Sequence, residues 1–217
     1  MLEPLPLISV VRKSTLCSKA PLLILLHGYG SNENDLFSFA ADLPEKLFII
    51  ALRAPYTMHQ QGYAWYAINF DGDEKKWNDV KQAKEAMKRI IDCVDRACEI
   101  YNIDTKNINL LGFSQGCILS TALAINHPKK FKNVIGLSGY ICREFLDKPQ
   151  EKKTYEHLNI YCSNGTLDPI IPIEWARETP KYLNSLGIKN YYSEFSVGHE
   201  VAAENFSEFR EWLQARI

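Results

Sequence analysis

The sequence has little of what marks several special classes of protein. Its 25 Lys and Arg nearly balance its 26 Asp and Glu, so the formal net charge is -1. Nucleic acids and acidic membranes are bound through clustered, uncompensated basic charge, which this composition does not supply. With 11 Gly, 10 Pro and 46% hydrophobic residues, the chain also differs from disordered and collagen-like proteins. We therefore expect a globular protein without a nucleic-acid partner.

Long apolar runs are absent as well. The longest, 22–26 and 47–52, fall far short of the roughly 20 residues that span a bilayer, so no stable membrane insertion is expected. The first 13 residues carry an early glutamate and two prolines and lack the apolar core of a signal peptide. These features predict a cytoplasmic protein.

The six cysteines show no C-x-x-C spacing, which would indicate a zinc or redox site. They lie mostly in apolar surroundings, so buried free thiols are favoured over a disulfide framework. A chain of this length can bury about 70% of its unfolded surface without metal or disulfide. We expect one domain over residues 1–217, with no metal or cofactor. The cysteines are Cys17, Cys93, Cys98, Cys117, Cys142 and Cys162.

Short apolar runs alternate with stretches of helical periodicity, a rhythm typical of α/β proteins with a mostly parallel sheet. The last six of the seven predicted strands lack polar alternation, which indicates helices on both faces of the sheet. Proline 180 is expected to kink the fourth helix or to mark a second start. The predicted strands are 7–12, 22–27, 47–52, 108–113, 133–137, 158–162 and 191–197. The predicted helices are 35–42, 78–101, 115–126, 173–186 and 201–215.

Two stretches interrupt this rhythm. Residues 54–77 are rich in aromatics, and long connections in compact domains are often binding loops. That segment is equally well interpreted as a wall of the substrate site or as an aromatic hairpin covering the edge of the core. Residues 143–156 are charged and are expected at the surface.

The strongest local motif is Gly-Phe-Ser-Gln-Gly at 112–116, between a predicted strand and a predicted helix. A G-x-S-x-G sequence in that setting is typical of a nucleophile elbow, in which small residues let a serine stand exposed above a sheet. The motif predicts Ser114 as a nucleophile. A glycine-rich turn with an N-capping serine is the structural alternative.

A serine nucleophile needs an imidazole to accept its proton and a carboxylate to orient that imidazole. With such an elbow the partners follow in the order serine, acid, histidine. His199 and Asp168 both come just after predicted strands, at the sheet edge where catalytic groups gather. Asp147 is the main rival for the acid. The other histidines fit less well because of their positions along the chain: His27, His59, His127 and His157.

Acyl transfer also needs two backbone donors for the oxyanion. One is expected to be the amide of Gln115, and the other is expected in the loop 27–31, which follows a strand as required. The same loop does not fit a dinucleotide fingerprint, because Glu33 occupies the third glycine position. His27 itself is interpreted as structural.

The chain contains seven short sequence blocks in a specific order: 26–30, 53–55, 65–66, 112–116, 137–139, 168–172 and 198–199. Together they resemble the phospholipase/carboxylesterase family of small α/β-hydrolases, which includes acyl-protein thioesterases and bacterial carboxylesterases. The resemblance extends over nearly the whole chain, about residues 22–212. It implies an α/β-hydrolase fold without a large cap domain, a Ser114, Asp168 and His199 triad, and an oxyanion hole formed by the amides of Tyr29 and Gln115. It also raises the expectation of a homodimer.

Three positions depart from the family pattern. Tyr29 stands where many members have Leu, Cys117 where Gly is usual, and Asn164 where His is common. Each of the three proposed catalytic residues is retained, so the departures concern acyl-chain length and thioester use. We further predict that Tyr29, Trp65 and Tyr66 line the acyl site.

The sequence thus predicts a serine hydrolase that cleaves carboxylic esters or thioesters through an acyl-enzyme. A lysophospholipase or a peptidase could use the same residues. A catalytically silent binding protein with this fold is the alternative from another class.

Overall fold

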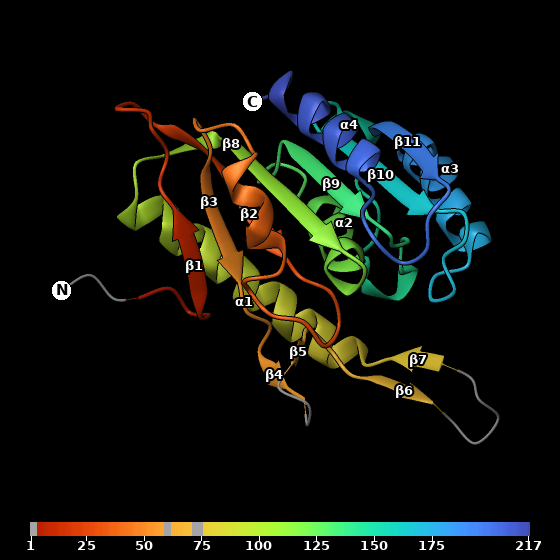
Figure 1. Cartoon of the computed structure of the whole chain (residues 1–217). Helices are drawn as coiled ribbons and strands as arrows, with labels where there is room; N and C mark the ends of the chain where they lie inside the picture. The colour runs from red at the N-terminus through yellow and green to blue at the C-terminus, as the bar shows by residue number, and fades with distance from the viewer. Residues whose placement is uncertain (1–3, 59–61, 71–75) are drawn as a thin grey trace.

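The computed structural model describes residues 4–58, 62–70 and 76–217. Its main sheet has seven strands, which lie in the order β1-β3-β2-β8-β9-β10-β11 (Figure 1). Only β1 runs antiparallel to its neighbour; the other pairings are parallel. The predicted α/β fold with a mostly parallel sheet of seven strands is confirmed. The strands are β1 (Ser9–Arg12), β2 (Ala20–Leu26), β3 (Phe48–Leu52), β8 (Ile103–Phe113), β9 (Asn133–Leu137), β10 (Asn159–Gly165) and β11 (Lys189–Phe195).

Helices cover both faces of the sheet. Alternate residues of β2 face opposite ways, with Leu22, Ile24 and Leu26 in one core cluster and Leu23 and Leu25 in the other. The first cluster packs under α1 (Val80–Ile100), α2 (Gln115–Asn126) and α3 (Ile173–Leu186). The second packs under the 3₁₀ helix η1 (Leu36–Ala41) and α4 (Ala203–Gln214). In Figure 1, η1 and α4 lie in front of the sheet, with α1 and α2 behind it.

Most helix predictions agree closely with the structure. The bounds of α2 and α3 are those predicted, and α1 begins after Asp79, whose carboxylate accepts the amide hydrogen of Gln82 as an N-cap. Helix α3 continues through Pro180, so this proline does not mark a second start. The segment predicted as a helix at 35–42 forms a 3₁₀ helix rather than an α-helix.

The last strand is less buried than its apolar sequence suggests. Every residue of β11 is half-buried or exposed, because β11 is the edge strand of the sheet. Helices lie on both of its faces, as predicted: Glu194 pairs with Arg177 of α3, and Ser193 donates to Glu208 of α4. Its tyrosines gave an apolar appearance to a strand whose side chains reach solvent.

The described residues of the segment 54–77 form two small hairpins after β3, and no cap domain is seen in the described part of the chain. The first hairpin pairs β4 (Tyr56–Thr57) with β5 (Tyr63–Ala64), and the second pairs β6 (Ile68–Phe70) with β7 (Lys76–Asn78). His59 lies outside the described residues. The charged stretch after β9 contains the short 3₁₀ helices η2 (Arg143–Phe145) and η3 (Lys152–Tyr155).

All six cysteines lie in the described part of the chain and are free, as predicted. Four are buried, whereas Cys17 is exposed and Cys98 is intermediate. Within the described ranges, no helix is long and apolar enough to cross a membrane. Nor does that part of the chain bring three or more His, Cys, Asp or Glu side chains together as a metal site would need.

Candidate active site

Ser114 stands on a sharp turn between β8 and α2. Its backbone has a positive φ of 52°, a conformation that residues other than glycine rarely adopt. The turn is tight because a Cβ atom at position 112 would overlap the carbonyl of Gly116, and one at position 116 would overlap the carbonyl of Leu26. Only glycine fits at both positions. The local chain path is therefore that of a nucleophile elbow.

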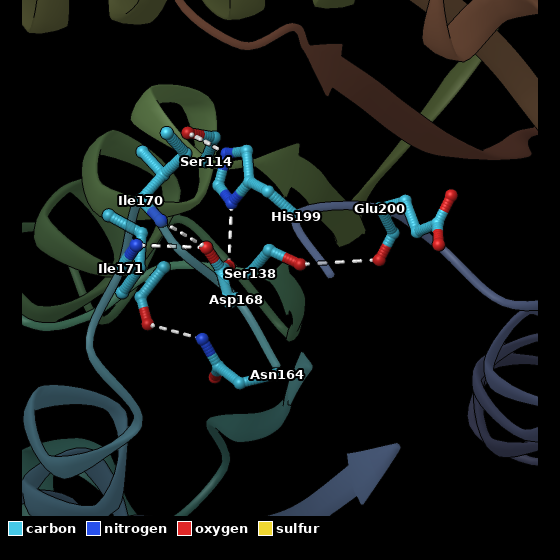
Figure 2. A network of polar contacts seen from close by, with 9 residues as sticks. Ser114, Ser138, Asn164, Asp168, Ile170, Ile171, His199 and Glu200 are labelled. Atoms are coloured by element: carbon cyan, nitrogen blue, oxygen red, sulfur yellow. Dashed lines mark hydrogen bonds and ion pairs between the residues drawn. The ribbon is translucent and has the colours of Figure 1, made fainter. Parts of the chain in front are cut away.

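The structure brings Ser114, His199 and Asp168 into one hydrogen-bonded row (Figure 2). The Ser114 hydroxyl lies 2.9 Å from Nε2 of His199, and Nδ1 of His199 lies 2.6 Å from Oδ2 of Asp168. With the proton on Nδ1, Nε2 is free to accept the serine hydrogen. The three residues follow the C-terminal ends of three different strands, β8, β10 and β11.

Both oxygens of the Asp168 carboxylate make hydrogen bonds. Oδ1 accepts the amide hydrogens of Ile170 and Ile171, at 2.7 and 2.9 Å, while Oδ2 faces His199 (Figure 2). The side chain of Asp168 is fully buried and that of His199 is 19% exposed. Phe113 packs against the imidazole, with ring centroids 4.9 Å apart. The imidazole thus has a fixed position between a buried carboxylate and an aromatic ring.

The competing candidates lie elsewhere. The backbone amide of Asp147 donates to Asn126, the last residue of α2. Helix α2 has 12 residues and starts beside Ser114. Since a helix of this length spans about 18 Å, Asp147 lies at the end of α2 that is far from Ser114. The imidazole of His157 donates to the carbonyl of Pro128, and His127 caps the end of α2. None of these groups is placed to reach the serine.

Two backbone amides beside Ser114 have no acceptor among the described residues: those of Tyr29 and Gln115. The Gln115 amide directly follows the serine. The Tyr29 turn is also close, because a Cβ atom at position 28 would lie 3.5 Å from Cβ of Ser114. Two unused donors next to the predicted nucleophile are what an oxyanion hole requires.

Ser114 and His199 open into a cavity of about 280 Å³. Tyr29 and Tyr66, two of the three predicted wall residues, line it. Tyr29 is 43% exposed, whereas Tyr66 is almost fully buried and its pKa is raised well above the usual range by that burial. Tyr140 also lines the cavity, together with four isoleucines that the sequence did not single out: Ile68, Ile118, Ile170 and Ile171.

Trp65, the third predicted wall residue, does not line this cavity. Its side chain is fully buried, and its indole N–H donates to the carbonyl of His27 at 2.9 Å. The prediction placed Trp65 at the acyl site because of its aromatic neighbours. Both residues lie in the bend after β5 and pack in the same core cluster, but only Tyr66 also reaches the cavity.

His27 is part of the framework under this turn. Its ring is 1% exposed, Nδ1–H donates to the carbonyl of Gly28 at 2.7 Å, and Nε2 accepts the amide hydrogen of Ala54 at 3.1 Å. Burial lowers the pKa of His27, which favours the neutral ring. Both nitrogens are used inside the fold, in agreement with the structural role predicted for this histidine.

The sequence did not predict an ion pair that lies beside the loop 27–31. Arg53 donates from Nε and Nη2 to both carboxylate oxygens of Glu33, at 2.7 and 2.5 Å. Its guanidinium also lies 4.6 Å from the ring centroid of Tyr63. These residues stand 20 positions apart in sequence, and no local pattern links them. Only the polar character of Glu33 just after an apolar strand could have drawn attention to it.

The two other departures from the family pattern have structural places near the site. Cys117 is buried against Gly136 and Gly139, and burial raises its pKa well above the ordinary value. Asn164 is buried and donates to the carbonyl of Gly139 at 3.1 Å (Figure 2). Both therefore pack or brace the loop after β9 rather than entering the cavity.

Comparison with known proteins gives consistent results. A family model described as phospholipase/carboxylesterase matches residues 9–217. An acyl-protein thioesterase 1 from Yarrowia lipolytica is 23% identical over 232 residues, covering 100% of this chain and 99% of that protein. The crystal structure of a Bacillus cereus carboxylesterase superposes with a TM-score of 0.82 at 20% identity, covering 97% and 95% of the two chains. That of Zea mays acyl-protein thioesterase 2 gives 0.78 at 20% identity, covering 96% and 98%.

Proposed function

The chain belongs to the phospholipase/carboxylesterase family, and from this premise we propose that it is a serine hydrolase that forms an acyl-enzyme on Ser114. Its substrates are carboxylic esters or thioesters. The observation that carries the proposal is the row from Ser114 through His199 to Asp168, with hydrogen-bond distances of 2.9 and 2.6 Å. These distances lie within the range in which a base accepts a proton from its nucleophile.

The first half of the reaction acylates the serine. Oγ of Ser114 forms a bond to the acyl carbon while its proton passes to Nε2 of His199, and Asp168 stabilises the resulting imidazolium. The carbonyl oxygen becomes an oxyanion, which accepts hydrogen bonds from the amides of Tyr29 and Gln115. The bond to the leaving alcohol or thiol then breaks, and His199 returns its proton to that group.

The second half releases the acid. His199 removes a proton from water, whose oxygen attacks the acyl carbon, and a second oxyanion forms in the same hole. Collapse of this intermediate breaks the bond to Ser114, which recovers its proton from His199. No step calls for a metal or a cofactor. A cytoplasmic setting, where thiols stay reduced, suits the six free cysteines.

A substrate panel tests the proposal. Purified wild-type protein is offered p-nitrophenyl esters from acetate to palmitate, an acyl-thioester, a lysophospholipid and a peptide. We expect ester or thioester turnover that is lost in Ser114→Ala and retained in Ser185→Ala, a matched serine exposed near the end of α3. Preferential turnover of the lysophospholipid or peptide would instead favour those alternatives.

Covalent labelling gives an independent measurement. A fluorophosphonate should add to Ser114, as located by mass spectrometry, and should leave Ser114→Ala unmodified. Equal rates for wild type and Ser114→Ala on every substrate, with no adduct on Ser114, would leave the catalytically silent binding protein as the better description.

A further inference from the structure

We propose that Trp65 and the side chain of Gln115 are positioning residues. They fix the position and direction of the two oxyanion-hole amides relative to each other. The inference rests on the proposed function, since it concerns the same reaction. It assigns a role to Trp65, whose complete burial removes it from the cavity wall. It also assigns a second role to Gln115, separate from that of its backbone N–H.

The side chain of Gln115 joins the elbow to residues 65–66, which directly follow β5. Its Oε1 accepts the amide hydrogen of Trp65 at 2.8 Å, and its Nε2 donates to the carbonyl of Tyr66 at 2.8 Å. The residue is 2% exposed, so these bonds are shielded from water. The amide group of glutamine is both donor and acceptor, as this pair of backbone partners requires. The residue that supplies one oxyanion donor is therefore fixed to residues 65–66.

Trp65 continues the connection to the other donor. Its indole N–H reaches the carbonyl of His27 at 2.9 Å, and the imidazole of His27 donates to the carbonyl of Gly28 at 2.7 Å. Gly28 is joined by a peptide bond to Tyr29, the second proposed donor. A continuous series of buried hydrogen bonds thus runs from Gln115 through Trp65 and His27 to the Tyr29 turn.

Tyr63, in β5, also holds the turn on the far side of Tyr29. Gly30 donates its amide hydrogen to the carbonyl of Tyr63 at 2.9 Å, and Tyr63 donates to the carbonyl of Ser31 at 2.8 Å. Tyr29 therefore lies between two anchored points, His27 and Gly30, which are both bonded to residues 63–65. Its own amide has no acceptor among the described residues, so the backbone on either side sets its direction. That backbone is held by this brace and by the hydrogen bond from the Ser31 amide to the carbonyl of Gly28, at 3.2 Å.

Such a brace has a chemical purpose because oxyanion donors act through preorganisation. Their benefit depends on pointing at the developing negative charge before the reaction begins. A displacement of about 1 Å in a catalytic group can cost on the order of 10²-fold in rate. Loss of the brace should therefore weaken binding of the transition state more than binding of the substrate.

Trp65→Phe tests the proposal, because phenylalanine keeps an aromatic ring in the core and lacks the indole N–H. Trp212→Phe on α4 is the matched control, since Trp212 packs on Tyr161 in the other core cluster. Both are compared with wild type for kcat and KM on a p-nitrophenyl ester and for Ki of an alkyl trifluoromethyl ketone. That ketone forms a tetrahedral oxyanion adduct on the serine. Fluorophosphonate titration gives the concentration of active sites.

We expect Trp65→Phe to lower kcat per active site roughly 10-fold, less than the loss of a whole donor. The Ki of the ketone should rise by the same factor, with KM within about twofold of wild type, and Trp212→Phe should match wild type. A fall in active-site concentration with an unchanged Ki would show a purely structural role and overturn the inference. Unchanged kcat and Ki would overturn it as well.

A second variant covers the case in which Trp65→Phe does not fold. Gln115→Met keeps the backbone N–H and the approximate side-chain length but loses both side-chain hydrogen bonds, and the same joint change in kcat and Ki is expected. An unchanged Ki here would overturn the inference while the esterase activity stands. If wild type neither turns over esters nor binds the ketone, the proposed function fails, and the inference fails with it.

Discussion

The two sides of the cavity differ in how deeply their supporting hydrogen bonds are buried. On the oxyanion side, Trp65 and His27 are 0% and 1% exposed. On the acid and base side, Asp168 and His199 stand on loops after β10 and the exposed edge strand β11, where Leu167 and Ile170 are 67% and 54% exposed. Few buried contacts permit local opening at low free-energy cost. The base side should therefore be the easier of the two to disturb without unfolding the core.

The largest effect on this comparison is expected from Asp168→Asn. An amide NH₂ at this position favours the wrong imidazole tautomer, so that Nε2 carries a hydrogen and cannot accept the serine proton. We expect kcat to fall roughly 10⁴-fold, with the far-UV circular dichroism and thermal midpoint close to wild type. Turnover near the wild-type rate would move the role of the acid to another residue, with Asp147 next to be tested.

An intermediate effect is expected from Arg53→Met, on the oxyanion side. The change leaves the carboxylate of Glu33, which is 4% exposed, without its two charge-assisted hydrogen bonds. We expect a loss of about 2 kcal/mol in the free energy of unfolding, measured by urea denaturation at pH 7. Since Glu33 lies two residues from Ser31, kcat should fall as well.

The pH dependence checks the cause of this loss. Arg53 holds the pKa of Glu33 below its ordinary value of 4.5, mainly through their hydrogen bonds. A lowered folded-state pKa gives stability that is present above pH 4.5 and is lost as the pH falls through the lowered value. The stability difference between wild type and Arg53→Met should therefore shrink on acidification below pH 4.5. A constant difference would attribute the loss to packing against Tyr63.

The smallest effect is expected from Arg177→Met, the counterpart on the base side. Arg177 also makes two hydrogen bonds to one carboxylate, that of Glu194 on β11, at 2.7 and 2.8 Å. This pair lies at the surface, where solvent screens it and side-chain entropy offsets it. We expect no measurable change in the urea midpoint or in kcat. An effect as large as that of Arg53→Met would show that burial does not set the difference between the two sides.

The sequence predicted the elements whose local signals agree with their surroundings. Glycines on both sides of Ser114 made the elbow recognisable, and strong periodicity gave the bounds of α2 and α3. Positions after predicted strands gave Asp168 and His199, since parallel strands end at the same edge of a sheet.

The remainder depends on contacts between distant segments. The apolarity of Trp65 fits a cavity wall and a core equally well, and no local signal shows that its indole N–H finds an acceptor in the carbonyl of His27, 38 positions away. The Glu33–Arg53 pair likewise joins two loops that no local pattern connects. The exposure of β11 follows from its place at the edge of the sheet. The tyrosines in its sequence are equally compatible with burial, so they do not reveal this exposure.

The pairing of β2 with β8 has a consequence for how the protein folds. Leu22 lies opposite Ile108 at the centre of the sheet, so a long loop of chain must close before the nucleophile turn acquires its neighbour. Contacts of such wide sequence separation slow folding. The three side chains of the proposed triad then become aligned only once β10 and β11 have joined this centre. Reaction with a fluorophosphonate during refolding would therefore report one of the last events in folding, well after secondary structure has appeared.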